Sequence, residues 1–113
     1  MREKSPSTPE SLAAFDALKA ELAGAGVVEG AMFGTRALTL GGKALACLSG
    51  NEFAVKLRRD TPEIEAALAL PGAELFDPSG KGRPFKDWVL IPEGGDAHWA
   101  ALAEDALRLA SES

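Results

Sequence analysis

Histidine and cysteine are the side chains that most often act as acid–base catalysts, nucleophiles and metal ligands. This chain of 113 residues contains one of each, His98 and Cys47. Cys47 stands between Ala46 and Leu48 in an apolar segment, which favours the neutral thiol over the reactive thiolate. His98 falls near the start of the last expected helix, where a histidine is usually exposed. We therefore predict no catalytic residue, no metal site and no cofactor, and a protein that is not an enzyme.

A single cysteine cannot form a disulfide within the chain or supply a cysteine-rich zinc site, and it fits a reducing compartment. Residues 1–7 are polar and no apolar stretch follows them, so a secretory signal is not expected. No run of the chain approaches the ~20 apolar residues of a membrane span. We predict a cytoplasmic protein with no membrane partner.

The charged residues are distributed unevenly along the chain. Residues 36–59 hold five basic residues against one acidic residue, Glu52, and residues 81–92 hold three against Asp87, although the whole chain has a net charge of −5. The excess of acid lies outside these two segments, mainly in the expected helices. A local basic surface is therefore predicted on the strands and loops. Its candidate contacts to an anion or a partner are Arg36, Lys56, Arg58, Lys81, Arg83 and Lys86.

Three helices are expected from capping residues and from apolar residues spaced three and four apart. Either Ser7 or Thr8 can cap the first helix, which ends near Gly24. Asp60 stands at capping spacing from Glu63 and starts a short second helix. A third follows Asp96, and its apolar stripe consists of Trp99, Leu102, Ala106 and Leu109.

Between these helices the apolar period changes to two, which is typical of half-buried strands. A two-residue turn at Gly41-Gly42 suits a β-hairpin, and a second turn follows at residues 49–51. The expected strands cover residues 38–40, 44–48 and 53–57, with a short leading piece around Met32-Phe33 and two later strands around residues 75–76 and 88–91.

This order of elements predicts an α+β fold. Strands joined by tight turns are antiparallel, and the apolar helix stripes need a sheet face to cover. We expect a two-layer domain with an antiparallel sheet, flanking helices and the order α-β(3)-α-β(2)-α. Residues 1–6 are expected to be disordered and residues 7–113 to form a single domain, without internal repeats or an inter-domain linker.

Several short motifs follow one another along the chain: Met32-Phe33-Gly34, Gly42-Lys43, the strand at residues 53–57, the segment at Phe76 and the run from Gly82 to Val89. In this order the motifs resemble the N-terminal domain of the TfoX/Sxy family of bacterial competence regulators. The resemblance covers about residues 9–110, nearly the whole chain.

The resemblance implies an α+β domain with an α-β-α-β-α layout and a regulatory role, and it implies no catalytic residue. Family members that control competence have a second, helical domain with no counterpart in these residues, so the expected role is regulation in general rather than competence itself. The small YjbR/MmcQ-type domains are similar in general layout and have been linked to DNA binding.

These observations leave three kinds of function open. The leading hypothesis is a non-enzymatic regulatory or protein-interaction domain, whose partner is another protein or a second copy of the chain. The alternative is an accessory domain that contacts nucleic acid through the candidate cations and Lys43, although the net charge of −5 disfavours it. The third is a small-ligand or enzymatic role, for which one histidine and one apolar cysteine provide the least support.

Overall fold

A six-stranded antiparallel sheet organises the chain, with strand order β1-β2-β3-β4-β6-β5. The structure is a computed structural model and describes residues 8–32, 35–77, 82, 84–92 and 98–111. The elements are α1 Pro9–Leu22, a 3-10 turn Ala23–Ala25, β1 Val28–Met32, β2 Thr35–Leu40, β3 Lys43–Ser49, β4 Glu52–Lys56, α2 Pro62–Leu68, β5 Glu74–Leu75, β6 Trp88–Ile91 and α3 Trp99–Ser111.

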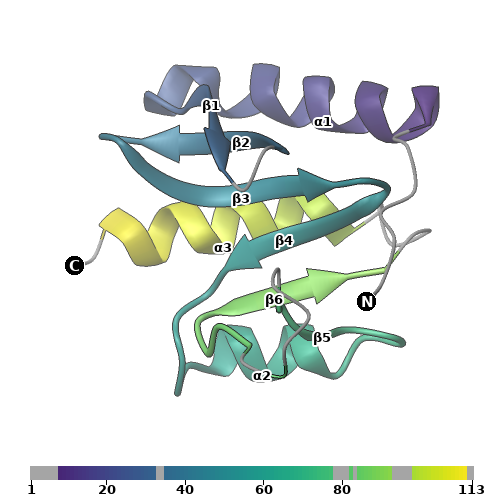
Figure 1. The fold of residues 1–113 in the computed structure, drawn as a ribbon. Helices are drawn as coiled ribbons and strands as arrows, with labels where there is room; N and C mark the ends of the chain where they lie inside the picture. The colour runs from purple at the N-terminus through teal and green to yellow at the C-terminus, as the bar shows by residue number, and fades with distance from the viewer. Residues whose placement is uncertain (1–7, 33–34, 78–81, 83, 93–97, 112–113) are drawn as a thin grey trace.

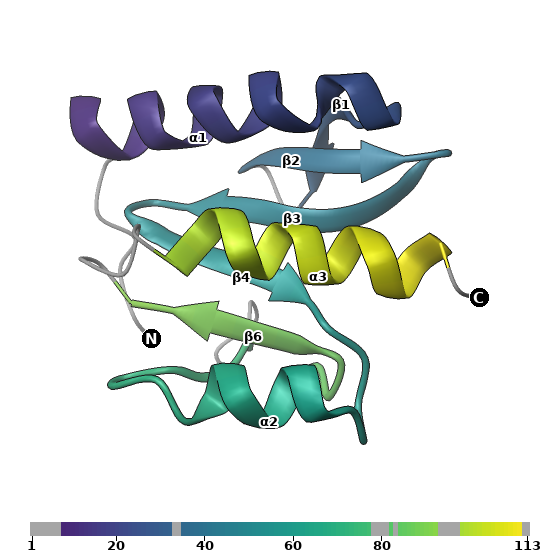
Figure 2. The same ribbon diagram turned by 180° about the vertical axis from the view of Figure 1, so that it is seen from behind.

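The predicted α+β class and antiparallel sheet are confirmed, and the two views show the helices along the sheet (Figure 1, Figure 2). The structure differs in having four strands before α2 instead of three, because β1 extends over residues 28–32. Gly30 allows this strand to approach β2 closely, since an added Cβ would lie 3.0 Å from Cγ2 of Thr39. Buried and exposed residues do not alternate in β1, since Val28, Glu29 and Ala31 are all exposed. Phe33, of the expected leading piece, lies outside the described residues, as do residues 1–6.

Threonine caps both of the first two helices. Thr8 Oγ1 accepts a hydrogen bond from the Ser11 amide at 3.2 Å, which decides between the two candidate caps of α1. Thr61 Oγ1 accepts from the Ile64 amide at 3.2 Å. Asp60, the expected cap of α2, instead precedes the cap Thr61 and has a φ of 63°. The expected cap Asp96 lies outside the part of the chain that the structure describes.

The larger part of the core lies between the sheet and the three helices. Alternate residues of the strands, among them Leu38, Phe53 and Val89, pack there against the apolar stripes of the helices. In Figure 2, α3 crosses this face in front of β3 and β4. The Phe53 and Trp99 rings stack with their centroids 4.8 Å apart and an interplanar angle of 15°. The stack fixes the start of α3 on the centre of the sheet.

A second, smaller cluster occupies the opposite sheet face. Small side chains form its row across the central strands, where Ala37 pairs with Cys47 and Cys47 with Ala54. Phe76 and Trp88 pack in the same cluster. Cys47 is fully buried there and has no disulfide, so it is a small core residue in agreement with its apolar sequence context.

Asn51, in the turn between β3 and β4, ties the start of α1 to the sheet. Its Oδ1 accepts the Thr8 amide at 2.8 Å, and the side chain is only 6% exposed. We expect Asn51→Ala to lower the free energy of unfolding by about 1–3 kcal/mol, because a buried polar group loses its partner. Urea denaturation measures this change. Glu104→Ala, at an exposed position of α3, is the control and should stay within about 0.5 kcal/mol; equal effects would contradict the assignment.

No helix among the described residues is both long enough and apolar enough to cross a membrane.

Candidate functional site

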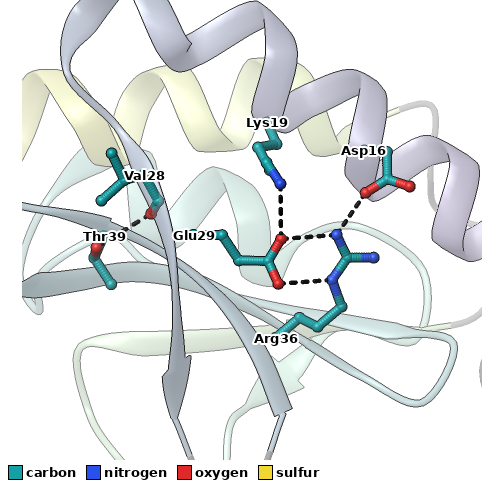
Figure 3. Close-up of polar contacts among 6 residues, drawn as sticks. All are labelled: Asp16, Lys19, Val28, Glu29, Arg36 and Thr39. Atoms are coloured by element: carbon teal, nitrogen blue, oxygen red, sulfur yellow. Dashed lines mark hydrogen bonds and ion pairs between the residues drawn. The ribbon is translucent and has the colours of Figure 1, made fainter.

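Arg36, one of the predicted partner contacts, is bound within the chain. Its Nε donates to Glu29 Oε2 at 3.0 Å and its Nη2 to Glu29 Oε1 at 2.8 Å, while a further bond reaches Asp16 on α1. Lys19 Nζ also donates to Glu29 Oε1 at 3.0 Å, and Figure 3 shows this network between α1 and the β1–β2 hairpin. The Arg36 guanidinium lies 4.8 Å from the centroid of the Phe15 ring. Arg36 therefore joins α1 to the sheet.

The network has a strong electrostatic consequence for Glu29. Hydrogen bonds from Arg36 and then Lys19 lower the pKa of the Glu29 carboxyl from 4.5 to about 2. The hydrogen bonds that Arg36 donates, to Glu29 first and to Asp16 second, raise the pKa of the Arg36 guanidinium above its ordinary value. All four charged side chains are partly exposed, so the network stabilises the fold modestly.

We expect Glu29→Gln to lower the free energy of unfolding by about 1 kcal/mol near neutral pH, after allowance for solvent screening. Because the pKa of Glu29 is lower in the folded chain, the stabilisation is complete above the ordinary value of 4.5 and is lost as the pH falls towards about 2. Urea denaturation across this range should show the wild type and the variant converging at low pH. Glu21→Gln, at an exposed position of α1, is the control and should change the free energy of unfolding by no more than about 0.5 kcal/mol at neutral pH. A pH-independent difference for Glu29→Gln would contradict the account.

Two other predicted contacts, Lys56 and Arg58, lie together at one end of the sheet. Lys56 ends β4, and Lys43 begins β3. The pairing of β3 with β4 ends at Ala46 opposite Val55, so Lys43 and Arg58 both lie beyond the paired residues at this end of the sheet. A pocket of about 170 Å³ opens there. We call it the basic pocket, and its lining residues are Lys43, Ala44, Leu45, Lys56, Arg58, Ala106, Leu109 and Ala110.

Three elements converge on the basic pocket. The start of β3, the end of β4 and the last turns of α3 lie at the same end of the sheet (Figure 1, Figure 2). A bulge between β2 and β3, after Leu38, leaves Leu45 without a β2 partner. Leu45 and Leu109 lie mostly buried beneath the pocket, whereas Ala44 and Ala110 are half-buried. The pocket thus has a basic wall and an apolar floor.

The backbone around Arg58 is held in an uncommon conformation. Arg58 and Asp60 both have a φ of 63°, which costs a residue with a Cβ roughly 1–2 kcal/mol. The Thr61 hydroxyl lies 2.8 Å from the carbonyl oxygens of both Leu57 and Arg58 and donates there. These contacts offset part of the strain and fix the segment from which the Arg58 side chain leaves the sheet.

Asp87 binds the residues on both sides of Arg58, namely Leu57 and Arg59. Its backbone carbonyl accepts the Leu57 amide at 2.8 Å, and its Oδ1 accepts both the Arg59 amide and Arg59 Nε at 2.9 Å. The hydrogen bond from Arg59 is the main cause of a lowered pKa of the Asp87 carboxyl, and Lys56 contributes by its charge. Arg59 is therefore used inside the chain while its neighbour Arg58 is directed to the basic pocket.

Arginines elsewhere show the same internal use. Arg108 Nη2 on α3 donates to Glu63 Oε2 on α2 at 2.8 Å and to Asp105 Oδ1 at 3.2 Å. By contrast, Lys43 and Arg58 form no ion pair with any residue within the described ranges. The basic pocket thus concentrates positive charge that no carboxylate among the described residues neutralises through an ion pair.

The remaining predicted contacts do not join this site. Lys86 is exposed and is not part of the pocket lining, and Lys81 and Arg83 lie outside the described residues. The strand aromatics Phe53 and Trp88, 0% and 7% exposed, belong to the two core clusters and offer no platform for stacking bases.

The histidine and the cysteine of the chain are not among the residues that line the basic pocket. Cys47 is fully buried and His98 is exposed just before α3. No group of three or more histidine, cysteine or acidic residues that could hold a metal ion occurs among the described residues.

The sequence predicts a role for Lys43 only under the nucleic-acid hypothesis. It does not predict that residues of α3 line the pocket, namely Ala106, Leu109 and Ala110. The hairpin turn at Gly50-Asn51 could have indicated that the start of β3, with Lys43, lies at the same end of the sheet as Lys56, because the register follows from Ser49 opposite Glu52. Nothing local in the sequence indicates that the end of α3 covers this corner. Comparison of the chain with models of protein families, with curated proteins and with solved structures finds no match.

Proposed function

We propose that the chain is a non-enzymatic protein-interaction domain that binds an acidic region of a partner protein at the basic pocket. The observation that carries the proposal is the contrast among the cations. Arg36, Arg59 and Arg108 are neutralised by carboxylates of the chain, whereas Lys43 and Arg58 flank a pocket without such partners in the described part of the chain. Unneutralised charge beside a pocket attracts and orients a ligand of opposite charge.

The resemblance to the TfoX/Sxy N-terminal domain supports a regulatory purpose for this interaction. A regulator of this kind acts by binding, and a small pocket flanked by cations without ion-pair partners in the described residues suits this role. The single cysteine, buried and without a disulfide, supports a cytoplasmic location as part of the proposal.

Photo-cross-linking in cells tests the proposed function. A photoreactive phenylalanine analogue is placed either at Ser111, exposed directly beyond Ala110, or at Ala101, exposed near the start of the same helix. We expect one specific protein at Ser111 and not at Ala101, and we expect Arg58→Glu to remove it. A second copy of the chain would identify a homodimer as the partner. Equal capture at both positions, or capture that survives Arg58→Glu, would overturn the proposal.

Nucleic acid is the competing partner, because three cations could also meet three phosphates. Neutralising three phosphates weakens duplex binding roughly fortyfold between about 50 mM and about 200 mM salt. Fluorescence polarisation with labelled duplex and single-stranded DNA at these two concentrations tests this partner. We expect no binding at the lower salt; salt-sensitive binding lost in Arg58→Glu would replace the protein partner with nucleic acid.

A further inference from the structure

The basic pocket combines two chemically different surfaces in a small space. Lys43, Lys56 and Arg58 supply its polar wall, from the ends of two neighbouring strands and the connection to α2. Leu45 and Leu109 lie beneath it, 2% and 6% exposed. The half-buried lining residue Ala110 has a short side chain, which leaves room for an incoming apolar group. A ligand that uses the whole pocket must therefore be both anionic and apolar.

The volume limits how much of the ligand can enter. A pocket of about 170 Å³ is close to the ~150 Å³ of a protein cavity that holds one benzene molecule. It is well below the roughly 300–1,000 Å³ of sites that enclose a drug-sized molecule or cofactor. One side chain fits, and the remainder of the ligand must lie outside. This is the arrangement expected for a peptide that inserts a single anchoring residue.

The charge around the pocket favours carboxylates on the partner. The last turn of α3 contributes a partial negative charge of about −0.5 from its carbonyl ends, whereas the three lining cations contribute three full positive charges. Two acidic groups on the neighbouring elements form ion pairs with other residues, Asp87 with Arg59 and Asp105 with Arg108. Asp87 also attracts Lys56, which leaves Lys43 and Arg58 as the stronger contacts. The field at the pocket mouth is therefore positive.

We infer that the basic pocket binds a linear peptide segment in which one aliphatic side chain stands between two acidic residues. The aliphatic group enters beside Ala110 and lies over Leu45 and Leu109, and the flanking carboxylates meet Lys43 and Arg58. This inference rests on the proposed function and specifies the sequence that its partner presents.

Three peptides distinguish the contribution of the apolar floor of the pocket from the contribution of its cations. The first is acetyl-Gly-Glu-Leu-Glu-Gly-amide; the second replaces its leucine by glycine, and the third replaces both glutamates by glutamine. Their affinities for the full chain are measured by displacement of a fluorescent copy of the first peptide. Three variants are compared with the wild type: Arg58→Glu, Ala110→Met, which fills the apolar part without changing charge, and Lys86→Glu, a matched charge reversal outside the pocket. Thermal unfolding confirms that each variant is folded.

We expect the first peptide to bind at least about tenfold more tightly than either of the others. Ala110→Met should remove the advantage of leucine over glycine, Arg58→Glu should remove the advantage of glutamate over glutamine, and Lys86→Glu should change neither by more than about twofold. Equal binding of the leucine and glycine peptides, or of the glutamate and glutamine peptides, would overturn the inference.

Failure of this inference is distinguishable from failure of the proposed function. One result is that a protein is cross-linked at Ser111 and lost in Arg58→Glu, whereas the leucine and glycine peptides bind equally. This result would keep the proposal of an acidic protein partner and reject the proposed aliphatic anchor. Discrimination among the peptides without any cross-linked protein would reject the protein partner and assign the pocket to a small amphipathic acid.

Discussion

Phe53→Ala will lower the free energy of unfolding by about 3–5 kcal/mol. Phe53 is fully buried near the start of β4, and its ring stacks on Trp99 with 4.8 Å between centroids. Alanine removes the ring from the layer between sheet and helices and leaves a cavity beneath the first turn of α3. Since a domain of this size has a total stability of roughly 5–15 kcal/mol, the variant will lie near the limit of folding.

Urea denaturation with intrinsic tryptophan fluorescence measures this effect, and two further variants make the result decisive. Phe53→Leu keeps most of the apolar volume and should remain folded at a cost of at most about 1.5–3 kcal/mol. Val28→Ala, on a strand residue that is 60% exposed, should change stability by no more than about 0.5 kcal/mol. A similar small change at Phe53 would contradict its place in the main core.

Reversing charge at Lys43 and Arg58 together will weaken binding of the acidic partner roughly 30- to 150-fold, or about 2–3 kcal/mol. Each substitution replaces an attraction by a repulsion at the pocket mouth, and neither residue has an ion pair in the described chain to lose. The comparison uses isothermal titration with the partner region identified by cross-linking. Lys86→Glu, the matched reversal outside the pocket, should weaken binding less than about threefold.

A purely structural role for these cations makes the opposite prediction. Positive side chains near the carboxyl end of α3 would stabilise the helix dipole by about 0.3–1 kcal/mol each at an exposed site. In that case Lys43→Glu with Arg58→Glu would lower the melting temperature and leave the partner affinity within about threefold of wild type. That pair of results would contradict the interaction site.

The sequence predicts elements well where the signal is local. The start of α2 is predicted only to within one residue, since its cap is Thr61 and not the expected Asp60. Thr8, one of the two expected caps of α1, caps that helix through its own side chain, and the Gly41-Gly42 turn joins β2 to β3 as expected from a two-residue hairpin. Both features depend on contacts within a few residues, so their residue types suffice to indicate them. The edge strand β1 gives no such signal, because a strand with one neighbour buries few of its side chains.

The candidate site is harder to predict, because its members meet only through the sheet and α3. Arg36 and Arg58 look alike in the sequence, yet Arg36 meets Glu29 and Asp16 whereas Arg58 lines the basic pocket. The difference arises from the position of α1 beside β2 and from the positive φ of Arg58. Neither is encoded in local spacing. The apolar part of the pocket likewise depends on where α3 ends relative to β3.

One measurement tests the central claim most directly: chemical-shift mapping of the ¹⁵N-labelled chain with the cross-linked partner region added. The account predicts that the largest amide shifts occur at the start of β3, at the end of β4 with Arg58, and in the last turn of α3, and that Arg58→Glu abolishes them. Shifts confined to the network of Arg36 and Glu29, or to the exposed edge of β1, would show that the partner binds elsewhere and would contradict the basic pocket as the interaction site.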